Sequence, residues 1–125
     1  MKLIEVRSLA LPEVRVLRYA RYCDERGYFS ETYRRSEIEA ALGGAPLGMF
    51  QCAQANQSFS HKNVVRGLHF QWNPLMGKLV RTVMGHMVDL ALDVRKGSPS
   101  LGKIIAYDMP ARLREEQDEW IWIPP

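Results

Sequence analysis

The chain has 125 residues, of which 46% are hydrophobic and 25% are charged, and its formal net charge is +3. This length predicts one domain, and the ordinary composition excludes a disordered or collagen-like chain. No apolar run approaches the roughly 18 residues of a membrane-spanning helix, and the charged N-terminus lacks the apolar core of a signal peptide. Two cysteines are too few for a disulfide scaffold. We therefore expect a cytoplasmic domain, and the small positive charge suits an anionic partner without specifying one.

Most of the chain has the character of short strands separated by Gly and Pro. We expect strands over residues 3–11, 14–23, 28–33, 49–59, 64–72, 78–84, 87–95, 103–108 and 119–123. The range 87–95 alternates most clearly, with Val88, Leu90, Leu92 and Val94 on one face and Asp89, Ala91, Asp93 and Arg95 on the other. Short strands at this spacing predict an antiparallel sandwich or barrel.

One helix is predicted, over residues 36–42. Ser36 followed by Glu39 is a capping-box pattern, in which the hydroxyl and the carboxylate satisfy each other's backbone donors. The pair Gly43-Gly44 is expected to end the helix. We expect this helix to cover one edge of a sheet and to carry no chemistry.

A row of polar side chains stands within the predicted strand at 52–60. At alternate positions it contains Gln54, Asn56, Ser58 and Ser60. A solvent-facing edge strand explains this row as well as a functional role does. The functional interpretation is a polar cavity lined by amides and hydroxyls, which suits a hydroxyl-rich or phosphate-bearing ligand.

The segment Arg66-Gly67-Leu68-His69-Phe70-Gln71 is the most informative one for chemistry. Arg66 and His69 are three residues apart, so a regular strand would place them on opposite faces. A bulge at Gly67 would turn both side chains into one cavity. A cation beside an imidazole suits anion binding next to a general base. The alternative is a structural histidine with satisfied hydrogen bonds.

Two further charged segments allow two interpretations each. Lys78 begins a predicted strand on the face opposite Leu79, either as a solvated lysine or as an inward charge that stabilises an enolate oxygen. The segment 24–31 is either a charged turn or a clamp for a phosphorylated aromatic ligand. In the clamp, Arg26 would bind phosphate and Phe29 would lie under a base.

The sequence argues against a metal site and against nucleic-acid binding. Barrel-shaped β proteins often bind iron or manganese through a His-x-His pair, whereas Gly67 and Gln71 stand two residues to either side of His69. We therefore predict no metal. Basic residues are spread among acidic ones, and no strand carries the aromatic platform that stacks on bases.

Together these segments resemble the dTDP-4-dehydrorhamnose 3,5-epimerase family, whose members are sugar-nucleotide epimerases. The matching pieces, in family order, are Asp24-x-Arg26-Gly27-x-Phe29-x-Glu31, Gln54-x-Asn56-x-Ser58-x-Ser60, Arg66–Gln71, Gly77–Val80, Asp89–Arg95 with Gly97–Pro99, Gly102-Lys103 and Trp122–Pro124. The resemblance implies an all-β cupin jelly roll, an antiparallel barrel or sandwich with one short helix near 36–42. It also implies that residues 1–125 form a single domain, the N-terminal part of a longer epimerase.

The resemblance implies roles for particular residues. His69 stands where the family has its proton-abstracting base, and Lys78 stands where a lysine faces the 4-keto oxygen and its enolate. The positions that contact the sugar nucleotide are Arg26, Phe29, Glu31, Gln54, Asn56 and Arg66. In relatives the turn that contains Arg26 often binds the nucleotide of a neighbouring subunit, which implies a homodimer. The implied reaction, inversion at carbons 3 and 5 of a dTDP-4-keto-6-deoxyhexose, needs no cofactor.

The resemblance stops at Pro125, before the family's second histidine, the tyrosine that serves as the acid and the aspartate that orients the base. The sequence therefore nominates no general acid. The alternative function is a non-catalytic cupin module that binds a sugar nucleotide.

Overall fold

The computed structural model describes residues 1–43 and 52–125. Its elements are β1 (Leu3–Ser8), β2 (Arg15–Ala20), β3 (Tyr22–Asp24), β4 (Gly27–Phe29), α1 (Arg35–Leu42), β5 (Lys78–Val80), β6 (His86–Leu92), β7 (Ile104–Pro110) and β8 (Gln117–Ile123). One sheet has the order β1-β2-β8-β5, and β3–β4 and β6–β7 form two-stranded sheets. Every ladder is antiparallel. No helix in these two ranges is long and apolar enough to cross a membrane.

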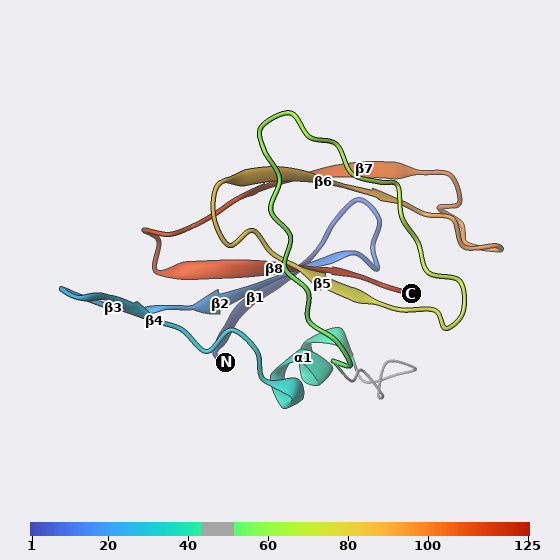
Figure 1. Cartoon of the computed structure of the whole chain (residues 1–125). Coiled ribbons are helices and arrows are strands. Elements are labelled where there is room, and N and C mark those ends of the chain that lie inside the picture. Colours follow the sequence, from blue (N-terminus) through green and yellow to red (C-terminus); the bar gives the residue numbers. More distant parts are fainter. Residues whose placement is uncertain (44–51) are drawn as a thin grey trace.

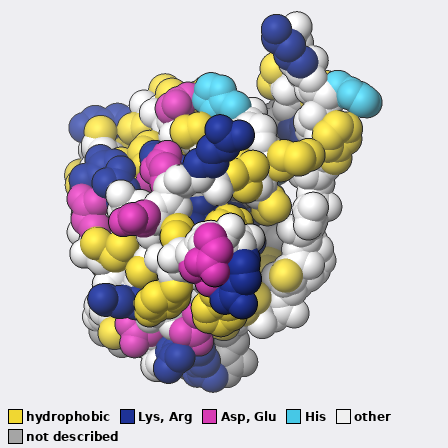
Figure 2. All heavy atoms as spheres, turned by 90° about the vertical axis from the view of Figure 1, so that its left-hand side faces the viewer, with side chains coloured by type: hydrophobic (Ala, Val, Ile, Leu, Met, Phe, Trp, Pro, Cys, Tyr) yellow, Lys and Arg dark blue, Asp and Glu magenta, His cyan; other side chains and the backbone are white. Residues whose placement is uncertain are grey.

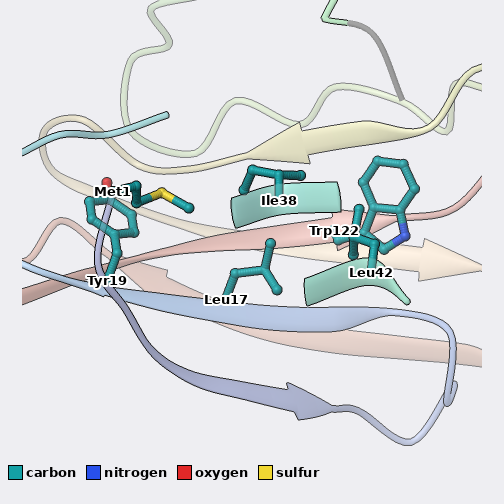
Figure 3. Close-up of a cluster of buried hydrophobic side chains, with 6 residues drawn as sticks. All are labelled: Met1, Leu17, Tyr19, Ile38, Leu42 and Trp122. Carbon is teal, nitrogen blue, oxygen red and sulfur yellow. The ribbon is translucent and has the colours of Figure 1, made fainter. Parts of the chain in front are cut away.

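The elements form three layers, with β6–β7 above the four-stranded sheet and α1 beneath it (Figure 1). Buried side chains join the sheet to α1, and they are Met1, Leu17, Tyr19, Ile38, Leu42 and Trp122 (Figure 3). Because alternate residues of a strand share a face, Leu17 and Tyr19 of β2 both point toward the helix. Full burial of one such side chain stabilises the fold by roughly 1.5–3 kcal/mol.

A second core joins the opposite face of the sheet to β6–β7. Its buried members are Leu11, Val14, Ala91, Met109 and Ile121. The predicted alternation of β6 is confirmed, but the inner face is the one that carries Asp89 and Ala91. Val88 and Leu90 lie on the outer face, where they are 55% and 47% exposed. Alternation defines two faces, whereas the packing partner decides which one is buried.

The predicted helix is confirmed with a different N-terminus, but its expected place at a sheet edge is wrong, because Ile38 and Leu42 pack on the face of the inner strands β2 and β8. The helix runs over Arg35–Leu42, its N-cap is Arg34, and no side chain caps it. The capping box is therefore wrong, because Ser36 lies inside the first turn and Glu39 accepts a hydrogen bond from Arg35 Nε at 2.7 Å. Gly43 ends the helix in the left-handed conformation, at φ 83°, as predicted. Gly44 lies outside the described residues.

The predicted strands at 49–59 and 64–72 are wrong over the described residues. Residues 52–77 contain no strand, and this segment passes in front of the sheets before it enters β5 (Figure 1). A strand requires a hydrogen-bonded neighbour, and no ladder is formed with this segment by residues 1–43 or 78–125. The predicted strand at 78–84 is likewise limited to Lys78–Val80. Residues 49–51 lie outside the described residues.

Candidate functional site

The predicted site residues lie in three parts of the chain. Arg26, Phe29 and Glu31 belong to the β3–β4 hairpin and the segment after it. Gln54, Asn56, Arg66 and His69 belong to the segment 52–77, and Lys78 begins β5.

The β3–β4 hairpin presents a cation and an aromatic ring at its surface. The backbone N–H of Arg26 donates to Asp24 Oδ1 at 2.9 Å, and its guanidinium donates to Asp24 Oδ2 at 2.6 Å. These bonds lower the pKa of Asp24 and raise the pKa of Arg26. A hollow of about 370 Å³ is lined by Tyr22, Asp24, Arg26, Tyr28 and Phe29. Phe29 is 70% exposed, so its ring is accessible to a planar ligand.

Glu31 already contacts two cations. Arg34 donates to Glu31 through Nε at 3.0 Å and through Nη2 at 2.8 Å. The ammonium of Met1 is also paired with this carboxylate. Glu31 therefore ties the chain start to the residue before α1, and a ligand hydroxyl would have to share its oxygens.

The polar row in the segment 52–77 is held together by its own side chains. Gln54 Nε2 donates to Asn56 Oδ1 at 2.9 Å, so these amides lie side by side. Arg66 donates to Ser60 Oγ at 2.8 Å and to the carbonyl oxygen of Phe59 at 3.0 Å. The hydrogen bond from Arg66 to Ser60 links the polar row to the segment that contains His69. Figure 2 shows part of the chain on the right standing away from the body, with basic and histidine side chains at its tip.

Lys78 projects from the face of the sheet that meets β6–β7. It pairs with Ile123 of β8, while Val80 pairs with Ile121. Val80 and Ile123 pack in the core between the sheet and β6–β7, and Leu79 packs on the opposite side with α1. Lys78 thus lies on the face opposite Leu79, as the sequence predicts. Among the described residues no hydrogen bond joins Lys78 to His69, so their shared role stays a prediction.

The backbone just before Lys78 lies against an aromatic ring. A Cβ added to Gly77 would overlap the ring carbons of Trp122, which is 2% exposed. Only a residue without a side chain allows this approach. The Trp122 indole therefore fixes the position of the backbone where the chain enters β5 at Lys78.

Asp89 is a candidate that sequence reasoning missed. It lies on the inner face of β6, opposite Tyr107 of β7, and burial raises the pKa of its carboxyl. Tyr107 in turn donates to Glu119 of β8 at 2.9 Å. A half-buried carboxyl with a raised pKa is typical of a functional site. The available signal was an aspartate in an alternating strand, which is informative only once the inner face is known.

Asp93, four residues later on the same face, has a different environment. Ser98 Oγ and Ser100 Oγ donate to its carboxylate at 2.6 and 2.7 Å, and Arg95 Nη2 donates at 2.9 Å. The two hydroxyls hold the pKa of Asp93 below its usual range. This carboxylate organises the turn after β6 and has no capacity left for a substrate.

Comparison with known proteins decides the family of this chain. The sequence profile of the family described as dTDP-4-dehydrorhamnose 3,5-epimerase matches residues 8–125. The chain belongs to this family. A member from Shigella flexneri is 38% identical over 122 residues, which cover 97% of this chain and 63% of the relative. A member from Neisseria gonorrhoeae is 36% identical, over 97% of this chain and 34% of the relative.

Solved structures of the family share the fold. A dTDP-6-deoxy-D-glucose-3,5-epimerase from Legionella pneumophila in complex with dTDP-4-keto-L-rhamnose matches with a TM-score of 0.85 and 32% identity, over 96% of this chain and 60% of that one. The enzyme from Sulfolobus tokodaii matches with a TM-score of 0.83 and 31% identity, over 100% of this chain and 65% of that one. These matches confirm the predicted cupin jelly roll. The chain spans less than two thirds of the length of each of these four proteins.

Proposed function

We propose that the protein is an epimerase that inverts carbons 3 and 5 of a dTDP-4-keto-6-deoxyhexose, in the biosynthesis of dTDP-L-rhamnose or a related deoxysugar. The observation that carries this proposal is the family match over residues 8–125. His69 and Lys78 stand at motif positions inside that match, in the two segments that meet at the start of β5.

The proposed chemistry uses the acidity of protons next to a ketone. Carbons 3 and 5 both flank the 4-keto group, so the imidazole of His69 can remove a proton from either carbon. The ammonium of Lys78 stabilises the negative charge that develops on the enolate oxygen. A proton from solvent or from an acid on the opposite face of the ring then returns to the carbon and inverts the centre, and the protonated His69 releases its proton to solvent. No metal and no organic cofactor takes part in this proposal.

The proposed binding of substrate divides between two regions. Arg26 binds the diphosphate and Phe29 stacks on the base, since both line the hollow of the β3–β4 hairpin. Gln54, Asn56, Arg66 and Glu31 bind the remaining polar groups of the sugar nucleotide. The hairpin projects from the edge of the molecule (Figure 1), where it is accessible to a second copy. We therefore propose a homodimer in which the hairpin serves the neighbouring subunit, and for a biosynthetic enzyme of this kind we propose the cytoplasm as its compartment.

The test is incorporation of solvent deuterium. The intact protein is incubated in heavy water with dTDP-4-keto-6-deoxyglucose, and we expect deuterium at carbons 3 and 5 by NMR. A chelator such as EDTA in the same reaction should leave the rate unchanged. Binding of dTDP without any incorporation would overturn the epimerase and favour a module that only binds sugar nucleotides.

A further inference from the structure

A buried group of charges lies at the base of the β3–β4 hairpin. Arg21 stands between β2 and β3, and its side chain is 3% exposed. It donates through Nη2 to Asp118 Oδ2 of β8 at 2.6 Å. Since burying a charge is costly unless the charge is paired, this contact orders the position of the guanidinium.

The Asp118 carboxylate receives donors from two more elements. Tyr19 of β2 donates its hydroxyl to Oδ2 at 3.1 Å, and Arg81, just after β5, donates to the same oxygen at 3.3 Å. Arg81 also donates to the Tyr19 hydroxyl at 3.1 Å. Burial and the nearby Asp118 raise the pKa of Tyr19 to about 12, so its hydroxyl stays a donor. Asp118 is thus a shared acceptor that holds β2, β5 and the hairpin base together.

The other side of Arg21 contacts the hairpin itself. Its guanidinium carbon lies 4.2 Å from the centre of the Tyr28 ring in β4, which is within cation–π range. In the described ladders, β3 and β4 pair only with each other. A two-stranded hairpin is marginally stable alone, so its orientation depends on contacts at its base.

We propose that Arg21 is a positioning residue that fixes the orientation of the β3–β4 hairpin, and with it Arg26 and Phe29, for binding of the nucleotide. This inference rests on the proposed function. One planar guanidinium stacks on Tyr28 and donates to Asp118 at the same time. Lysine keeps the charge but lacks the planar fork, so it cannot make both contacts in this geometry. Arg81, just after β5, donates to the same Asp118 carboxylate as Arg21. Asp118 therefore connects the base of the hairpin to the strand that begins with Lys78.

The test replaces Arg21 by lysine in the intact protein. We expect Arg21→Lys to weaken binding of dTDP by about tenfold, because a less preorganised hairpin must be ordered on binding. Amide hydrogen exchange should become faster in residues 22–29 and stay unchanged in β6–β7. The value of kcat at saturating substrate should stay within about twofold, so the loss appears in KM. A merely structural residue would accelerate exchange across the whole four-stranded sheet and lower kcat with it.

Two further variants sharpen this test. Asp118→Asn lies in β8, outside the hairpin, and should weaken dTDP binding in the same direction through Arg21. Arg35→Lys changes an exposed arginine of α1 that pairs with Glu39, and it should leave dTDP affinity and exchange as they are. Unchanged dTDP affinity in Arg21→Lys, with binding intact in the unaltered protein, would overturn this inference alone. Failure of the unaltered protein to bind dTDP would overturn the proposed function as well.

Discussion

The four-stranded sheet with its two covering layers, α1 and β6–β7, is called the body here. The body and the segment 52–77 are both rich in strand-forming residues, yet they differ completely in packing. Leu17 of β2 is 0% exposed and Trp122 of β8 is 2% exposed, because each strand has a neighbour and a covering layer. In the segment, Val65 is 90% exposed and Trp72 is 79% exposed. Residues of high β-propensity therefore form strands only where a partner strand is available.

The two regions also divide the residues that stabilise the fold from most of the residues proposed to carry the chemistry. The body contains both hydrophobic clusters, whereas the segment contains His69 and half of the predicted binding residues. Its hydrogen bonds are local, such as the bond between Gln54 and Asn56. Changes at the exposed positions of the segment should therefore alter activity with little effect on unfolding, and changes in the two hydrophobic clusters should lower stability with little direct effect on the proposed chemistry.

The largest effect is expected for His69→Ala. Removal of the proposed base should slow deuterium incorporation by about 10²–10⁴-fold, while the melting temperature stays nearly constant because the side chain is exposed. Mass spectrometry of the substrate and calorimetry measure the two quantities. His61→Ala is the matched control, since His61 lies in the same segment and its ring meets the Phe59 ring at an interplanar angle of 82°. An unchanged rate in His69→Ala would remove this residue from catalysis.

Leu17→Ala and Leu68→Ala apply the same chemical change to the body and to the segment. Leu17→Ala should lower the free energy of unfolding by about 2–5 kcal/mol, because it opens a cavity between β2 and α1. Leu68 is 60% exposed, so Leu68→Ala should change that free energy by less than about 0.5 kcal/mol. Urea unfolding measures both values. Equal losses would contradict the separation of the two regions.

Gly77→Ala tests the junction between the regions. The new methyl group would displace the Trp122 ring, and overpacking of this kind costs about 1–3 kcal/mol. Since Lys78 follows directly, deuterium incorporation should also slow. Gly85→Ala adds the same methyl group where no atom lies within 4 Å, so it lacks the steric overlap. Its φ of 82° adds backbone strain instead. Normal stability together with normal turnover in Gly77→Ala would show that the indole does not position this chain segment.

The smallest effects concern two carboxyls of one strand face and depend on pH. The lowered pKa of Asp93 means that its stabilising contribution is present above the unfolded value of about 3.9 and is lost as pH falls through the folded value. The raised pKa of Asp89 has the opposite sign, so stability is lost as pH rises through that folded value. Asp93→Asn should therefore destabilise the protein at pH 7, and Asp89→Asn should stabilise it. Urea unfolding at pH 7 and at pH 3 measures both; the Asp89→Asn gain should vanish at pH 3.

The sequence predicted the layered antiparallel fold, the helix and the alternation of β6, because each depends on local periodicity. It failed for residues 52–72, where propensity is high but no described neighbour completes a ladder. It also failed to identify the inner face of β6, since Val88 and Leu90 are more apolar than Asp89 and yet face outward. Orientation toward a distant layer is a property of the whole fold.

For the candidate site, short-range relations were predictable and long-range ones were not. The amides of Gln54 and Asn56 lie together because they are two residues apart. The contact of Arg21 with Asp118 joins residues 97 positions apart, and no local pattern indicates it. Family motifs assigned roles to His69 and Lys78, but their approach to one ketone is a matter of tertiary geometry and stays a prediction.

The burial of Trp122 against the backbone of Gly77 gives the molecule a natural fluorescent reporter. Trp122 emits from the packed interior beside Lys78, whereas Trp72 emits from the exposed segment three residues after His69. A dissolved quencher such as iodide will extinguish Trp72 first and reach Trp122 last. Trp120 is half-buried and also emits, so in a Trp120→Phe variant quenching titrations can follow each half of the proposed site separately, without an introduced label.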